Sequence, residues 1–164
     1  MVAKDRGDSR LVLLVEDHAP FRTLCRVSLE AAGFRIAEAV DGEDALRSIR
    51  VERPDLILLD VMMPRVSGWQ VAGTLLEDRT RDDIPIIFLT ARTSQSDRAR
   101  AFDLGARDYI SKPFDPGVLP EVIADVLDEV ERGQRDAKFA ETLETLRAER
   151  VLGREATVAG KVTK

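Results

Sequence analysis

The sequence predicts an α/β protein built on a parallel sheet, and three observations support this prediction. Two uninterrupted apolar runs, Leu11–Val15 and Leu56–Leu59, are typical of strands that are buried on both faces. Strand-like and helix-like segments alternate five times along the chain. Both apolar runs end in acids, with Glu16 and Asp17 after the first and Asp60 after the second. The carboxyl ends of the strands form the edge at which open α/β sheets bind ligands.

Short apolar segments between turn residues predict the strands, at residues 11–15, 34–38, 55–60, 84–90 and 108–111. Amphipathic segments predict the helices, at residues 20–32, 43–51, 68–79, 96–104 and 115–131. Pro20 and Pro116 lie in first turns, Asp41 is an N-cap, and Gly33 and Gly105 end helices. Right-handed crossovers then favour a flavodoxin-like, doubly wound (βα)5 fold with a five-stranded parallel sheet in the order 2-1-3-4-5.

The composition is that of a soluble globular protein. Of the 164 residues, 44% are hydrophobic and 34% are charged, which excludes a disordered or membrane-embedded chain. No apolar run approaches the roughly 20 residues that span a bilayer, and the polar start is unlike a signal peptide. The single cysteine, Cys25, excludes an internal disulfide and fits a reducing compartment. We therefore expect a cytoplasmic protein with no membrane partner.

The net charge of −5 is unevenly distributed. Residues 131–164 hold eight Lys/Arg and six Asp/Glu, so this tail carries about +2 and the rest about −7. An acidic main domain lacks the basic surface that nucleic acids require, and the tail is too mixed in sign to supply one. The sequence therefore predicts no direct contact with nucleic acid.

The tail differs in pattern from the rest of the chain. We expect residues 1–8 to be disordered, residues 9–131 to form one domain, and residues 132–164 to form a C-terminal helical extension that frays at its end. Gly133 interrupts the helical pattern, and Phe139, Leu143 and Leu146 then recur at spacings of four and three. This narrow apolar stripe fits a short helix that either folds back on the domain or binds a partner.

The predicted strand order brings Glu16, Asp17 and Asp60 together. Three carboxylates repel one another unless a cation joins them, and Mg²⁺ suits oxygen ligands and shares its sites with phosphate. The fourth strand ends at Thr90 and the fifth close to Lys112, so a hydroxyl and an ammonium reach the same edge. A carboxylate nucleophile, a metal, a lysine and a hydroxyl are the components of phosphoryl transfer to Asp60.

Over residues 9–131 the chain resembles the receiver domain of bacterial two-component response regulators. Each matching motif is modest alone, but their order and their places at the strand ends are specific. The motifs are Leu14-Val15-Glu16-Asp17, Leu58-Leu59-Asp60-Val61-Met62-Met63-Pro64 followed by Gly68, Leu89-Thr90-Ala91, and Gly105-Ala106 followed by Asp108-Tyr109-Ile110 and Lys112-Pro113-Phe114.

The resemblance implies a metal-dependent phosphorylation site. Asp60 would accept the phosphoryl group and would bind Mg²⁺ directly together with Asp17. Glu16 would help through water, and the backbone carbonyl of Met62 would complete the protein ligands. Taken alone, Asp60 could be a helix cap and Glu16 a solvated charge.

The resemblance also implies a switch. Lys112 would pair with the phosphoryl oxygens, Thr90 would turn its hydroxyl toward them, and Tyr109 would move into the vacated space. Taken alone, Tyr109 could be an ordinary half-buried strand aromatic, and Thr90 could merely cap the next segment. The peptide bond before Pro113 is expected to be cis.

These roles predict a signalling switch that catalyses only its own phosphorylation and dephosphorylation. A histidine kinase or a histidine phosphotransfer protein would supply the phosphoryl group. The added charge would bias the helix over 96–104, the strand over 108–111 and the helix over 115–131, which would bind a downstream protein.

Alternatives remain open. The chain could be an interaction module that ignores phosphate, although its acidic pocket is intact. It could be a hydrolase, although Met62 stands where haloacid-dehalogenase-type phosphatases place a second acid. It could also be a fragment whose effector domain is missing. Some DNA-binding regulators dimerise through the surface formed by the helix over 96–104, the strand over 108–111 and the helix over 115–131. Arg107 and Val122 depart from the pattern of those regulators, so any homodimer is expected to use the helix after Gly133.

Overall fold

The computed structural model describes residues 9–92, 94–134 and 137. The chain divides into two units, Met1–Leu127 and Asp128–Lys164. The expected disorder at residues 1–8 and the apolar stripe at Phe139, Leu143 and Leu146 lie outside the described residues. No helix among the described residues is long and apolar enough to cross a membrane.

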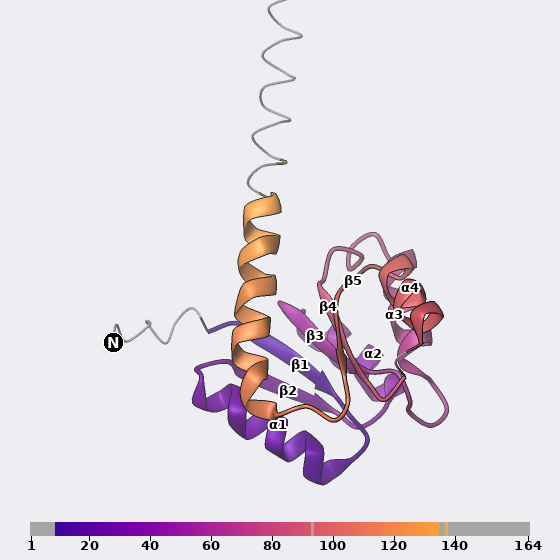
Figure 1. Cartoon of the computed structure of the whole chain (residues 1–164). Helices are drawn as coiled ribbons and strands as arrows, with labels where there is room; N and C mark the ends of the chain where they lie inside the picture. The colour runs from indigo at the N-terminus through magenta and orange to yellow at the C-terminus, as the bar shows by residue number, and fades with distance from the viewer. Residues whose placement is uncertain (1–8, 93, 135–136, 138–164) are drawn as a thin grey trace, which may run out of the picture. The chain divides into compact units, whose positions relative to one another are not determined.

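The first unit is built on a five-stranded parallel sheet in the order β2-β1-β3-β4-β5, which confirms the predicted topology (Figure 1). The three central strands are buried along their whole length, as their apolar runs predict. The strands are β1 (Leu11–Val15), β2 (Arg35–Ala39), β3 (Leu56–Asp60), β4 (Ile86–Thr90) and β5 (Ala106–Ser111).

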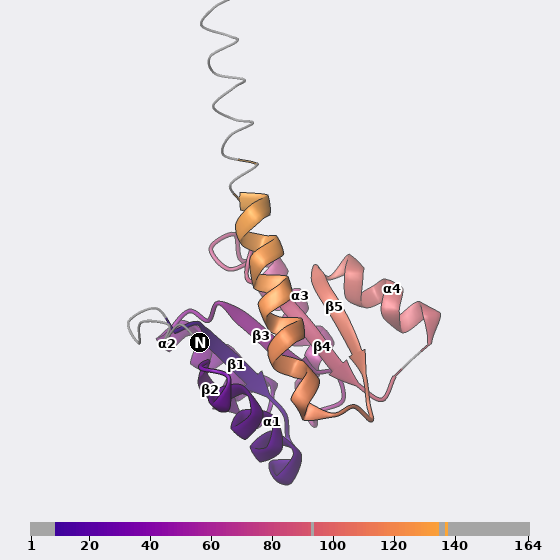
Figure 2. The same ribbon diagram turned by 60° about the vertical axis from the view of Figure 1, so that its left-hand side comes forward.

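Helices cover both faces of this sheet (Figure 2). They are α1 (Ala19–Ala31), α2 (Gly42–Val51), α3 (Gly68–Glu77) and α4 (Gln95–Asp103). One hydrophobic core joins Leu13, Ile57 and Phe88 of the sheet to buried residues of α2, α3 and α4. Because side chains alternate along a strand, Leu14 and Leu58 point to the opposite face, which α1 covers.

The fifth strand begins two residues earlier than predicted. Ala106 pairs with Ile86 and Asp108 with Ile87, so Arg107 is an extra residue in a β-bulge. The bulge breaks the alternation of apolar and polar residues, and it conceals the first part of the strand from sequence inspection.

The segment after β5 also differs from prediction. The sequence predicts a helix from Asp115, but Pro116–Val118 form a 3-10 turn. In this turn the Asp115 carboxylate accepts a hydrogen bond from the Gly117 amide at 2.9 Å. Residues 119–127 are helical and bury Leu119 and Ile123. An Asx-type side-chain contact of this kind competes with the first helical turn.

In the second unit, residues 128–134 are helical. The predicted interruption at Gly133 is therefore wrong. A glycine inside a helix costs only about 1 kcal/mol relative to alanine, and Glu129, Glu131 and Arg132 before it are good helix formers.

The turn from β3 into α3 depends on close backbone approach at Gly68. The Gly68 amide donates to the Val61 carbonyl at 3.0 Å, which brings the start of α3 against the end of β3. A Cβ atom at this position would lie 2.3 Å from the backbone oxygen of Asp60. Only glycine fits without moving the strand end that carries the carboxylate.

We predict that Gly68→Ala lowers the free energy of unfolding by about 1–3 kcal/mol, because the added methyl group overlaps the backbone of Asp60. Urea denaturation measures this change. Gly73→Ala is the matched control in the same helix, since a Cβ there meets nothing within 4 Å. The control should be neutral or stabilising by up to about 1 kcal/mol. Equal behaviour of the two variants would contradict the argument.

Candidate functional site

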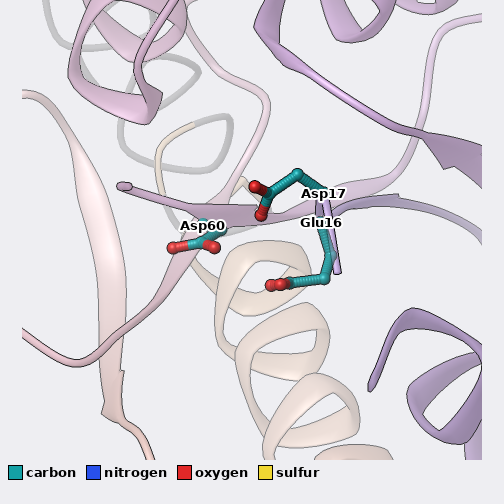
Figure 3. A group of neighbouring side chains, drawn as sticks. All are labelled: Glu16, Asp17 and Asp60. Atoms are coloured by element: carbon teal, nitrogen blue, oxygen red, sulfur yellow. The ribbon is translucent and has the colours of Figure 1, made fainter. Parts of the chain in front are cut away.

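Three carboxylates meet where β1 and β3 end. Glu16 and Asp17 follow β1, and Asp60 is the last residue of its neighbour β3. One oxygen from each carboxylate lies within 4.8 Å of the others, and Figure 3 shows the side chains turned toward a shared space. Glu16 and Asp60 are buried, whereas Asp17 is exposed. The cluster that the strand order predicts is therefore present, and it opens to solvent on the side of Asp17.

An ammonium group lies against the two buried carboxylates. Lys112 Nζ is 2.8 Å from Glu16 Oε2 and 3.3 Å from Asp60 Oδ2. The Lys112 amide donates to the Thr90 carbonyl at 2.8 Å, which fixes the lysine beside the end of β4. The peptide bond between Lys112 and Pro113 is cis, as the resemblance implied.

The electrostatics of the cluster favour additional positive charge. Burial, followed by repulsion from Glu16, raises the pKa of Asp60 to about 6, although Lys112 and the Met62 amide oppose the rise. Burial alone would lower the pKa of Lys112, but its contacts with Glu16 and Asp60 outweigh burial and raise it. Three carboxylates therefore share one close ammonium among the described contacts. A divalent cation with a preference for oxygen ligands fits this charge deficit.

Met62 lies at the mouth of the cluster. Its side chain is exposed and its amide donates to Asp60 Oδ1 at 3.0 Å, so the backbone after β3 stays close to the carboxylate. Met62 also lines an open hollow of about 390 Å³ together with Trp69 and Arg92.

Thr90 and Tyr109 are joined through one loop residue. Thr90 is fully buried, and its hydroxyl oxygen accepts a hydrogen bond from the Arg92 amide at 3.1 Å. The Tyr109 hydroxyl donates to the Arg92 carbonyl. Tyr109 is half-buried and packs against the main core. Both side chains named from the sequence as switch residues thus contact the loop between β4 and α4.

Sequence reasoning missed Arg22. Its guanidinium donates to the backbone carbonyl of Glu16 at 2.7 Å and lies 3.5 Å from the carboxylate of Glu38. These contacts tie the turn that carries Glu16 and Asp17 to α1 and to β2. A single arginine on an amphipathic helix gives no sign of such a role, because the contact depends on the path of the turn.

We predict that, without divalent cations, Asp60→Asn raises the free energy of unfolding at pH 7 by about 1–3 kcal/mol. A carboxyl whose pKa is higher in the folded chain destabilises that chain once it ionises. This penalty is present above pH 6 and disappears below about pH 4, where both states are protonated. Urea denaturation at pH 7 and pH 4 measures it. Asp125→Asn, at an exposed position, is the control, and a loss of stability in Asp60→Asn at pH 7 would contradict the prediction.

Known proteins resemble this chain in sequence. It is 44% identical to the phosphate regulon transcriptional regulatory protein PhoB of Escherichia coli over 111 residues, which cover 68% of this chain and 48% of PhoB. It is 42% identical to the transcriptional regulatory protein AfsQ1 of Streptomyces coelicolor over 126 residues, which cover 77% of this chain and 55% of AfsQ1. The chain thus spans about half the length of these relatives.

A solved structure and a family model agree with these relatives. The receiver domain of the sensor histidine kinase PA1611 from Pseudomonas aeruginosa, with a magnesium ion in its active-site cleft, is 30% identical with a TM-score of 0.67 and covers 74% of this chain and 99% of its own. The model of the response regulator receiver domain matches residues 12–124, a range that holds the acidic cluster, Thr90 and Lys112. This chain therefore belongs to the receiver-domain family of two-component response regulators.

Proposed function

We propose that this receiver domain accepts a phosphoryl group on Asp60 from a histidine kinase or a histidine phosphotransfer protein. The observation that supports this most strongly is the contact of Lys112 with both Glu16 and Asp60 inside a cluster of three carboxylates. A structural ion pair needs one partner for each charge, whereas this site has excess negative charge beside a buried nucleophile. The excess suits a metal ion, and the ammonium suits an incoming phosphoryl group.

The proposed metal is Mg²⁺. Asp17 and Asp60 would bind it directly, Glu16 would act through water, and the Met62 carbonyl would complete the protein ligands. When bound, Mg²⁺ neutralises charge on the phosphoryl oxygens. The magnesium ion in the PA1611 receiver domain supports this proposal.

In the proposed phosphoryl transfer, the chain supplies the Asp60 nucleophile and the Lys112 charge. An Asp60 oxygen attacks phosphorus as the bond from phosphorus to the donor's imidazole nitrogen breaks, and the released imidazole takes a proton from solvent. Lys112 balances charge on the phosphoryl oxygens from its position 3.3 Å from Asp60 Oδ2. Water later attacks phosphorus, the bond between phosphorus and the Asp60 oxygen breaks, and inorganic phosphate leaves, which restores the Asp60 carboxylate. The domain thus catalyses only its own phosphorylation and dephosphorylation.

The proposed output is a rearranged protein-binding surface. Thr90 ends the strand beside β3, and its hydroxyl would leave the Arg92 amide to contact the phosphoryl group. The loop between β4 and α4 would then shift. Tyr109, whose hydroxyl donates a hydrogen bond to the Arg92 carbonyl, would move with this loop. The affected surface comprises α4, β5 and the helical residues 119–127, and a downstream protein would read it.

We also propose a domain organisation and a location for the chain. We assign residues 9–131 to the receiver and residues 132–164 to a C-terminal extension, in the cytoplasm and without direct contact with nucleic acid. A second candidate is that the chain is the receiver part of a longer regulator. The observation in its favour is that the chain covers about half of relatives named as transcriptional regulators.

We predict that acetyl phosphate with Mg²⁺ adds one phosphoryl group to the chain, detected by intact-mass spectrometry. Asp60→Asn should abolish the adduct because it removes the nucleophile. Asp125→Asn, at an exposed helical position, should leave it unchanged, and a chelator should prevent it. An adduct of equal yield in Asp60→Asn, or none in the native chain, would refute phosphorylation at this residue. The second result would favour a module that ignores phosphate.

We further predict that any homodimer depends on the segment after residue 132. Arg107 is exposed at the bulge of β5. Neither Arg107 nor Val122 has the side-chain charge found at its position in regulators that dimerise through the surface of α4, β5 and residues 119–127. Deletion of residues 133–164 should convert a dimer into a monomer in multi-angle light scattering. A dimer that persists after the deletion would disprove this assignment.

A further inference from the structure

We propose that Phe21 is a positioning residue for the Lys112 ammonium, which it holds over the acidic cluster through the face of its ring. This inference rests on the proposed function, because it concerns how Lys112 reaches the phosphoryl group.

The ring of Phe21 lies against the charged end of Lys112. Lys112 Nζ is 4.8 Å from the centroid of the Phe21 ring, within the range of a cation–π contact. The same ammonium contacts Glu16 Oε2 at 2.8 Å and Asp60 Oδ2 at 3.3 Å. The lysine side chain is only 24% exposed, so the ring replaces part of the water that the ammonium would otherwise bind.

Phe21 is itself held from two directions. It lies in the first turn of α1, where its amide donates to His18 Nδ1 at 3.3 Å. Its ring meets that of Phe114 edge to face, with centroids 5.3 Å apart and an interplanar angle of 77°. Farther along α1, the Ser28 hydroxyl donates to the Pro116 carbonyl at 2.9 Å. These contacts attach α1 to the segment that follows Lys112.

Unlike a hydrogen-bond acceptor, an aromatic ring face uses none of the three N–H donors of the ammonium. It stabilises the positive charge, and all three donors stay available for oxygen atoms. Lys112 must transfer donors from carboxylates to a phosphoryl oxygen during the proposed reaction. The contact with Phe21 persists through this exchange, because it does not depend on which oxygen the ammonium binds.

The test separates Lys112 from the metal site. Beryllofluoride, a phosphoryl mimic, is titrated at saturating Mg²⁺, and Mg²⁺ is titrated alone. Fluorescence of Trp69, the single tryptophan, reports both titrations from beside Met62. The variants are Phe21→Leu, which removes the ring, and Phe21→Tyr, which keeps it. Phe34→Leu makes the same change at a partly buried position directly before β2, at the amino ends of the strands and away from the acidic cluster.

Phe21→Leu should raise the beryllofluoride concentration for half-response by about 2- to 10-fold, the range expected from a lost cation–π contact. Its Mg²⁺ affinity should change by less than about twofold, because Lys112 is not a metal ligand. Phe21→Tyr and Phe34→Leu should match the native chain. Urea denaturation checks folding, and Phe21→Met replaces the leucine variant if that variant is unfolded.

Two results would overturn the inference. One is a beryllofluoride response in Phe21→Leu equal to that of the native chain. The other is an equal weakening of beryllofluoride and Mg²⁺ binding, which indicates a general structural role. Failure of the proposed function looks different, because the native chain itself would then not respond to beryllofluoride.

Discussion

The contact between Lys112 and the two buried carboxylates is the interaction on which the rest of the site depends. Two acids buried at adjacent strand ends would repel each other in a medium that screens poorly. The ammonium offsets much of this repulsion, yet the pKa of Asp60 remains raised to about 6. The site is therefore stable enough to fold and still attracts positive charge. The binding of a metal and a phosphoryl group, as proposed for this site, needs both properties.

The fold supplies this interaction by bringing distant strand ends together. β1, β3 and β4 are neighbours, and the segment after β5 returns Lys112 to the end of β4 through its amide. Gly68 lets α3 begin directly against the end of β3. Arg22 fixes the turn after β1 by binding the Glu16 carbonyl. Main-chain geometry at the boundaries of these elements thus places the groups of the site.

Local signals were enough to predict the strand order and the acidic cluster, because apolar runs, caps and strand-end acids are written in adjacent residues. The failures have two causes. The bulge at Arg107 depends on pairing with β4, which no local pattern encodes. The 3-10 turn at Pro116 and the helical state of Gly133 follow from competition between neighbouring residues whose outcome the residue types alone do not decide. The contact of Phe21 with Phe114 joins residues far apart in the chain, so no local spacing could indicate it.

The hydrogen bonds of Arg92 have a consequence for how this domain tolerates sequence change. Its amide meets Thr90 and its carbonyl meets Tyr109, so both contacts use main-chain atoms of one residue. The two side chains therefore share one peptide segment as a hydrogen-bond partner. The Arg92 side chain takes no part in either contact and pairs instead with Asp97 at 3.3 Å. Position 92 can thus acquire new side chains, and new surface chemistry, without loss of either main-chain contact.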